Sequence, residues 1–138
     1  MKREYIDVSS YQGEGYLPMI DFEAWRVAML RYCEELEVPN LTNMQKHNET
    51  DEVFVLLEGN CTLFTGGKGD SINELDAIAM KPLQLYNVKR GVWHTHTLDK
   101  AASVLIVENR NTCDSNSPKA ILTEAQLEQI RRLYEERA

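Results

Sequence analysis

The three histidines of the chain, His47, His94 and His96, are the residues whose type and spacing best suit chemistry, and all three lie in strand-like segments. Side chains alternate between the two faces of a strand, so His94 and His96 share one face, and Gln45 shares a face with His47. If both faces point into one cavity, three imidazoles and an amide oxygen meet there. Glu52, at the start of the next predicted strand, can add a carboxylate.

Imidazole nitrogens together with carboxylate and amide oxygens make a ligand set that suits Fe, Mn, Ni or Zn. The candidate metal ligands are therefore Gln45, His47, Glu52, His94 and His96. Three protein ligands with an open coordination position are typical of a catalytic site. Glu52 and His96 are also the candidates for moving a proton in a reaction. The alternative interpretation is that the histidines are hydrogen-bonded packing residues, with Glu52 on the surface and Gln45 at a polar rim.

Short strand-like segments surround these residues and must position them. They are bounded by Gly, Asn, Asp and Lys-Pro turns, and no helical pattern interrupts them. The predicted strands are Thr42–His47, Glu52–Leu57, Cys61–Thr65, Ala77–Met80, Leu83–Val88, Val92–Thr97 and Ser103–Glu108. This arrangement indicates an antiparallel sandwich or barrel. The runs 53–57 and 104–107 are apolar at successive positions, so their outer face should meet a helix or a partner subunit.

The segment from Gln45 to Gly59 resembles the first cupin motif, His-x-His-x(3,4)-Glu-x(6)-Gly. His47 matches the second histidine, Glu52 the glutamate and Gly59 the turn glycine, while Gln45 stands at the first histidine. Downstream, Gly91-Val92-Trp93-His94 resembles the Gly-x-x-His core of the second cupin motif. The resemblance covers residues 40–109, about half of the chain.

The sequence also departs from these motifs. Pro39 stands at the leading glycine of the first motif, and Lys89 and Leu98 stand at the proline and asparagine of the second. The replacement of a ligand histidine by Gln45 matters most, because an amide oxygen changes the affinity and geometry of a metal site.

The resemblance implies an all-β fold, a cupin-type antiparallel jelly-roll barrel. It also implies a divalent metal ion held by His47, Glu52 and His94, with Gln45 or His96 completing the set. Such an enzyme would act on a small polar substrate, a sugar derivative or a carboxylic acid, by isomerase, lyase or dioxygenase chemistry, because cupins host all three. Cupins also commonly pair through sheet edges and outer faces, so the resemblance predicts a homodimer.

Two other interpretations of the site stay open. One is a non-catalytic module that binds a small ligand or a metal without turnover. The other is a vestigial site in which His47 and His94 only hydrogen-bond within the core. Weaker candidates for the cavity or its rim are Tyr86, Glu108 and Arg110. The alternative interpretation is that Tyr86 is a core residue and that Glu108 and Arg110 form a surface ion pair.

Residues 1–39 read as an N-terminal extension that contains a helix. Asp21 can cap it, and its end falls near Val38, because Pro39 cannot continue a helix. Apolar residues recur at three- and four-residue steps, at Phe22, Trp25, Met29, Cys33 and Leu36. That spacing predicts an amphipathic helix that covers an apolar surface.

Residues 118–138 contain a second predicted helix, so that two helices flank a barrel core at residues 40–109 within one domain. Thr123 and Gln126 have the spacing of a capping box at its start. Leu127, Ile130, Leu133 and Tyr134 then form one apolar edge, and the opposite side is charged.

The composition restricts the class of partner. The 138 residues carry a formal charge of −7, and no Lys/Arg cluster offsets it, which argues against binding to nucleic acid or an anionic membrane. The cysteines, Cys33, Cys61 and Cys113, are odd in number and form no Cys-x-x-Cys pair, which favours a reduced compartment. With no secretion signal at the first residues and no run long enough to span a bilayer, a soluble cytoplasmic protein is expected.

Overall fold

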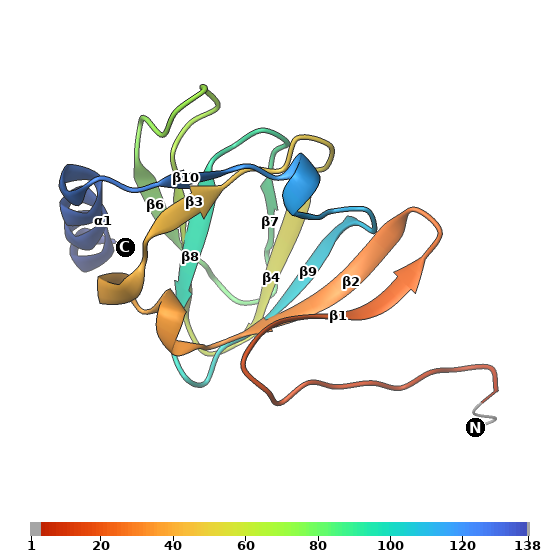
Figure 1. Ribbon diagram of the computed structural model, residues 1–138. Coiled ribbons are helices and arrows are strands. Elements are labelled where there is room, and N and C mark those ends of the chain that lie inside the picture. Colours follow the sequence, from red (N-terminus) through yellow and green to blue (C-terminus); the bar gives the residue numbers. More distant parts are fainter. Residues whose placement is uncertain (1–3, 138) are drawn as a thin grey trace.

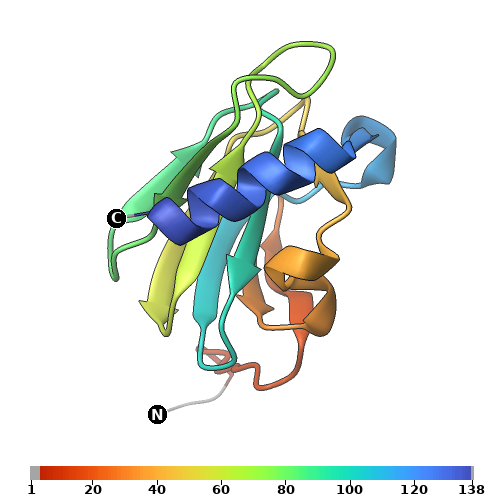
Figure 2. The same cartoon turned by 90° about the vertical axis from the view of Figure 1, so that its left-hand side faces the viewer.

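The computed structural model describes residues 4–137, and these are built mainly from β-strands. Two antiparallel five-stranded sheets face each other, and one helix lies across the outside of the second sheet (Figures 1 and 2). The first sheet has the order β1-β2-β9-β4-β7, with bounds Gly15–Phe22, Trp25–Arg31, Ser103–Asn109, Glu52–Glu58 and Leu85–Val88. The second has the order β10-β3-β8-β5-β6, with bounds Lys119–Ile121, Asn43–Gln45, His94–Leu98, Cys61–Thr65 and Asp76–Ala79.

The seven strands predicted between residues 42 and 108 are confirmed as β3 to β9, with ends shifted by up to two residues. The predicted barrel is not closed, because no strand pairing joins the two sheets within residues 4–137. The edge strands are β1 and β7 in the first sheet and β10 and β6 in the second, and all but β1 have only three or four residues. The result is an open sandwich with a cavity at one end.

Apolar side chains from the facing surfaces of the two sheets form the main core. Phe54, Leu56, Val104 and Ile106 of the first sheet pack with Leu63 and Leu98 of the second. Phe54 and Val104 are fully buried. This core fills the middle of the sandwich and leaves the ends of β4, β8 and β9 to carry polar residues.

The N-terminal helix predicted from Asp21 is wrong. Residues 15–31 form the β1–β2 hairpin, which pairs with β9 along the whole of β2. Two 3-10 turns follow, at Glu34–Leu36 and Val38–Asn40. The N-terminal segment is therefore part of the first sheet and supplies one wall of the cavity.

The physical reason for this error lies in the apolar pattern of the segment. Phe22 and Trp25 have helical spacing, yet they face each other across a two-residue turn, with ring centroids 5.9 Å apart. Along β2, Ala28 and Leu30 point into the core, whereas Val27 and Met29 lie on the opposite face. A strand that is apolar on both faces satisfies helical spacing too, and sheet pairing outweighs the weak local propensity.

The C-terminal helix α1, Glu124–Glu136, is confirmed, including its capping box. The Thr123 hydroxyl accepts the Gln126 N–H at 3.1 Å, and the Gln126 side chain accepts the Thr123 N–H at 2.9 Å. Ile130 is fully buried in a cluster with Met44 and Phe64. The helix thereby covers the outer face of the second sheet (Figure 2). No helix within residues 4–137 is long and apolar enough to cross a bilayer.

Candidate metal centre

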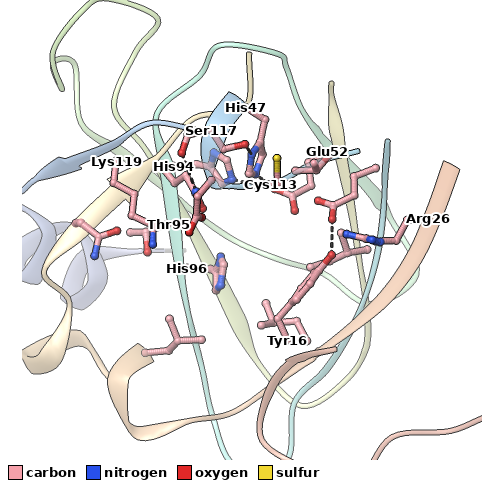
Figure 3. Close-up of a pocket in the computed structure, with 18 residues that line it drawn as sticks. Tyr16, Arg26, His47, Glu52, His94, Thr95, His96, Cys113, Ser117 and Lys119 are labelled. Carbon is pink, nitrogen blue, oxygen red and sulfur yellow. Dashed lines mark hydrogen bonds and ion pairs between the residues drawn. The ribbon is translucent and has the colours of Figure 1, made fainter. Parts of the chain in front are cut away.

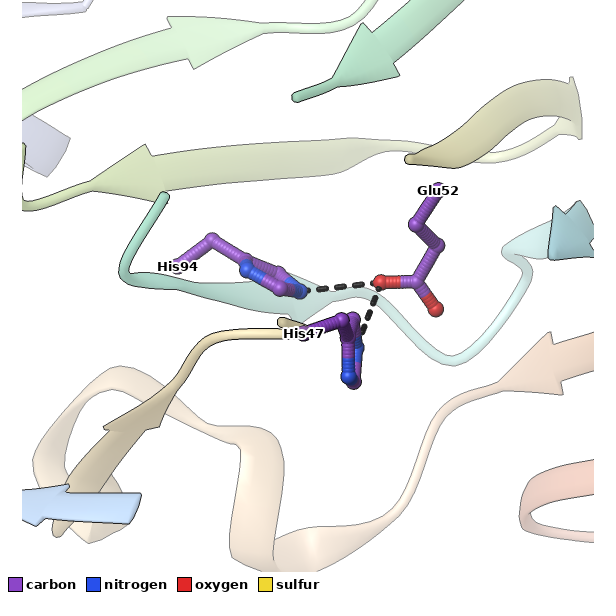
Figure 4. A group of neighbouring side chains, drawn as sticks. All are labelled: His47, Glu52 and His94. Carbon is purple, nitrogen blue, oxygen red and sulfur yellow. Dashed lines mark hydrogen bonds and ion pairs between the residues drawn. The ribbon is translucent and has the colours of Figure 1, made fainter. Parts of the chain in front are cut away.

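Three side chains from separate segments meet at one end of the space between the sheets (Figure 4). Glu52 is the first residue of β4, His94 is the first of β8, and His47 lies just beyond β3. The Oε1 atom of Glu52 is 3.1 Å from His47 Nε2 and 2.9 Å from His94 Nε2. All three residues are at most 8% exposed. The convergence of His47, Glu52 and His94 that the motif implies is therefore present.

The outer nitrogen of each imidazole has a partner that fixes its proton. His94 Nδ1 lies 2.9 Å from the Val92 carbonyl oxygen, which can only accept, so this nitrogen carries the hydrogen. His47 Nδ1 lies 2.7 Å from Ser117 Oγ, whose own hydrogen is directed to Asn116 Oδ1 at 3.0 Å. His47 Nδ1 therefore donates to Ser117. In the neutral rings, both Nε2 lone pairs then face the Glu52 carboxylate.

Two lone pairs and a carboxylate oxygen cannot share this space without a positive charge between them. In the metal-free protein, a proton supplies this positive charge. Burial by itself would lower the pKa of His94, but the hydrogen bond and charge of Glu52 outweigh burial and raise it. Burial would likewise raise the pKa of Glu52, but its hydrogen bonds with His47 and His94 hold that pKa well below its usual range.

A divalent cation fits the same arrangement. Ligand atoms about 2.0–2.2 Å from one ion are about 2.8–3.6 Å apart, for angles between a right angle and the tetrahedral value. The separations of 2.9 and 3.1 Å match that spacing. An imidazole whose Nδ1–H is held by an oxygen acceptor is the usual second-sphere arrangement around metal-binding histidines. The donor set and its supports therefore suit Fe, Mn, Ni or Zn.

Gln45 is paired with His94 across β3 and β8 and lines the same cavity. Its amide nitrogen donates to the Ser117 carbonyl oxygen at 2.9 Å, which orients the side chain. Among residues 4–137, its amide oxygen has no hydrogen-bond partner. A role for Gln45 as a metal ligand stays a prediction.

His96 lies on the same face of β8 as His94, as the strand alternation predicts, and also lines the cavity (Figure 3). It is not part of the close group formed by His47, Glu52 and His94. Its ring stands beside Phe54, with centroids 5.8 Å apart. Burial, reinforced by the charge of His94, lowers the pKa of His96 to about 4, so this imidazole is neutral at neutral pH.

The first sheet adds a wall that sequence reasoning largely missed. Glu108, one of the weaker candidates, does reach the cavity, and the Tyr16 hydroxyl donates to its carboxyl group. Arg26 lies beside Tyr16 and is held by Asp21 at 2.9 Å (Figure 3). Burial, followed by hydrogen bonding to Glu52 and the charge of Glu52, raises the pKa of Glu108 to about 8.

The other two weaker candidates lie elsewhere. The Tyr86 hydroxyl accepts the Lys81 N–H, and Arg110 lies near Asp21 with about half of its side chain exposed. Tyr16 and Arg26 escaped notice because their segment was assigned to an extension and a helix. The signal that could have found Arg26 is its alternation with Ala28 and Leu30, which puts all three on one face of a strand.

The cavity has a volume of about 420 Å³, which is within the range of sites for small molecules. Its mouth is bordered by the segment after β9, which contributes Cys113, Asp114 and Ser117. Apolar side chains, Leu30, Leu36 and Ile106, line part of its wall. The cavity therefore combines a polar cluster with an apolar surface.

The sequence matches no protein-family model and no curated protein. Solved structures are similar in fold. A hydroquinone 1,2-dioxygenase from Sphingomonas sp. TTNP3 with 4-hydroxybenzoate bound has a TM-score of 0.55 at 8% identity, over 77% of this chain and 70% of that one. Pac13 from Streptomyces, described as a nucleoside dehydratase, has a TM-score of 0.54 at 9% identity, over 80% and 82%. A cupin-2 domain protein from Shewanella frigidimarina NCIMB 400 has a TM-score of 0.49 at 17% identity, over 70% and 80%.

Proposed function

This chain has the fold of the cupin superfamily, and on that premise we propose that it is a metal-dependent enzyme acting on a small polar molecule, such as a sugar derivative or a carboxylic acid. One observation carries the proposal. Two imidazole nitrogens and one carboxylate oxygen converge, and the outer nitrogens of both rings are already held by oxygen acceptors. This is a prepared ligand set rather than a chance group of polar residues.

His47, Glu52 and His94 would hold the ion, and Gln45 is the proposed fourth ligand through its amide oxygen. A divalent ion there supplies a Lewis acid that polarises a carbonyl or hydroxyl of the substrate. For proton transfer the chain offers the carboxyl groups of Glu52 and Glu108 and the imidazole of His96, all around one cavity. Isomerisation, elimination and oxygen-dependent cleavage all fall within the proposal, because the fold does not select among them.

Elemental analysis tests the metal centre directly. Protein purified without chelator should contain about one Fe, Mn, Ni or Zn ion per chain, and His47→Ala and His94→Ala should each lose it. Asp70→Ala, in an exposed loop, is the matched control and should keep the metal. A wild-type protein without metal and without affinity for any of the four added ions would refute the proposal.

Turnover distinguishes the enzyme from a binding module. The metal-loaded protein should convert at least one member of a panel of sugar derivatives and carboxylic acids, monitored by NMR of the mixture. If panel members bind and stay unchanged over hours, the chain is a non-catalytic small-molecule binder, which is the second candidate function.

The cytoplasmic location expected from the cysteines remains a prediction.

The outer face of the first sheet supports the further proposal that the protein is a homodimer. Strand register aligns an apolar row across all five strands, formed by Leu17, Met29, Leu105, Val55 and Leu85. The next row continues with Ile20, Val27, Val107 and Val53. No helix covers this face within residues 4–137, since α1 lies on the second sheet (Figure 2).

The size of this face agrees with a second copy as its occupant. Strands about 4.8 Å apart, four of them seven or eight residues long and one of four residues, give roughly 520 Å² per chain, or roughly 1,000 Å² for two copies, which reaches the area expected of a biological interface. Light scattering at micromolar concentration should give twice the 15.9 kDa of one chain. Val107→Lys should yield the monomer, whereas Ile121→Lys, exposed on the other sheet, should not. A wild-type mass of one chain would refute the dimer.

A further inference from the structure

His96 is a polar side chain inside the cavity that nothing in the fold explains. Its Nδ1 atom is buried without a hydrogen-bond partner, the only such side-chain nitrogen or oxygen among residues 4–137. Neither ring nitrogen makes a hydrogen bond with these residues. Buried polar groups nearly always have a partner, and an exception calls for a missing one, such as a bound molecule.

The register of the strands places His96 one layer below the metal centre. The upper layer of inward-facing residues contains Glu52, His94 and the cross-strand pair Arg26 and Glu108. The next residue inward on each of these strands gives a second layer, in which Phe54 and Ala28 both pair with Ile106. His96, two residues after His94 on β8 and with its ring 5.8 Å from that of Phe54, belongs to this second layer.

We infer that His96 binds the substrate. The substrate is then a compact molecule with two ends, an oxygen-bearing end that faces His47, Glu52 and His94, and an uncharged, largely apolar ring that enters the second layer. The ring carries a hydroxyl or carbonyl that hydrogen-bonds to His96. This inference rests on the proposed function, because it assigns the second end of the same substrate.

Three features determine that chemistry. Apolar groups lie next to His96, because its ring is 5.8 Å from that of Phe54, which pairs with Ile106, and Leu30 and Leu36 also line the cavity, so an apolar ring fits there better than a polyanion or an open-chain polyol. The unpartnered nitrogens of an imidazole offer a ring N–H for a carbonyl and a ring lone pair for a hydroxyl. The cavity of about 420 Å³ has room for a substituted ring.

Two small probes test this assignment without knowledge of the substrate. Phenol has a ring and a hydroxyl, whereas toluene has the ring alone. Calorimetric titration of the wild-type protein should show phenol binding roughly tenfold more tightly than toluene, which is the effect of one buried hydrogen bond. In His96→Phe, which keeps a ring and removes both nitrogens, the two probes should bind equally. His96→Gln should restore part of the preference.

Metal content separates this inference from the proposed function. His96→Phe should retain as much metal as the wild type and have an equal or higher Tm, because the fold makes no hydrogen bond through His96. Equal binding of both probes to the wild type, or an unchanged phenol preference in His96→Phe, would overturn the inference. Loss of metal in His96→Phe would also overturn it, since His96 would then be a ligand. If the wild type contains no metal, the proposed function fails, while the probes still decide the role of His96.

Discussion

His94 and His96 are two residues apart on the same face of β8, yet their surroundings are opposite. Both nitrogens of His94 have a partner, Val92 and Glu52, whereas neither nitrogen of His96 has a hydrogen-bond partner among residues 4–137. The pKa of His94 is raised because Glu52 outweighs burial, and the pKa of His96 falls to about 4 because burial and the charge of His94 outweigh the charge of Glu52. Two histidines two residues apart on one strand thus have pKa values shifted in opposite directions, because their neighbours differ.

The largest effect on this contrast is expected when the Glu52 carboxylate, which lies beside His94 and not beside His96, is removed. Glu52→Gln should lower metal affinity more than about 100-fold, since a ligand and its charge are both lost. In chelator-treated protein it should also lower the free energy of unfolding by about 3–5 kcal/mol, because His94 loses the buried carboxylate that raises its pKa. Urea denaturation and metal titration measure the two effects.

Glu58→Gln, at the exposed end of the same strand, is the control and should change neither quantity by more than experimental error. A Glu52→Gln variant that bound metal as tightly as the wild type would place the centre elsewhere in the cavity.

The second prediction tests the surroundings of His96 through the pH dependence of the free energy of unfolding. The pKa of His96 is about 4 in the folded state and near 6.5 in the unfolded state. Between these pH values His96 is unprotonated in the folded protein and protonated in the unfolded chain, so the unfolded state binds more protons. Its contribution to stability is complete above pH 6.5 and is lost as the pH falls toward 4. Relative to His96→Phe, the metal-free wild type should lose about 3 kcal/mol across that range.

Urea denaturation of both proteins at several pH values gives this difference, in which the other titrating groups largely cancel. The difference should be flat above pH 7. Parallel pH profiles for wild type and variant would show that His96 titrates normally and is not held in an apolar layer.

The sequence predicted the upper layer much better than the lower one. His47, Glu52 and His94 could be found because metal ligands must be specific residue types, at spacings set by strands and turns. The strand alternation also placed His96 on the correct face. The absence of partners for His96 could not be predicted, because it depends on Phe54 and Ile106, which come from other strands and resemble ordinary core residues.

The cavity wall formed by Tyr16 and Arg26 shows a second limit of prediction from sequence, which is the pairing of distant segments. Both residues reach the cavity only because the N-terminal hairpin pairs with β9, a contact between segments about 80 residues apart. Local periodicity carries no information on such pairing, and in this segment it favoured a helix. The C-terminal helix was predictable because its capping box and its apolar edge lie within one continuous segment.

A smaller effect is expected from the residue that orients His47. Ser117→Ala removes the acceptor of the His47 Nδ1–H, so the ring is no longer held with Nε2 toward Glu52. Metal affinity should fall about 10- to 100-fold, as is usual for a second-sphere partner. Ser115→Ala, on the same segment but bonded to Cys113, should leave affinity unchanged. Equal affinities for the two variants would mean that His47 is oriented by packing alone.

The smallest expected effect concerns Tyr16, which connects the hairpin to the upper layer through Glu108. The hydrogen bond from Tyr16 lowers the pKa of Glu108, whereas burial and Glu52 raise it to about 8, so Tyr16→Phe should move that pKa further upward. The loss of stability should be about 1 kcal/mol at most, since Tyr16 is 40% exposed. NMR titration of carboxyl carbons in the metal-free protein reports the pKa, and Tyr11→Phe is the control, because the Tyr11 hydroxyl donates to the Glu14 carbonyl oxygen, away from the cavity. A downward shift of the Glu108 pKa would show that Tyr16 stabilises its neutral form instead.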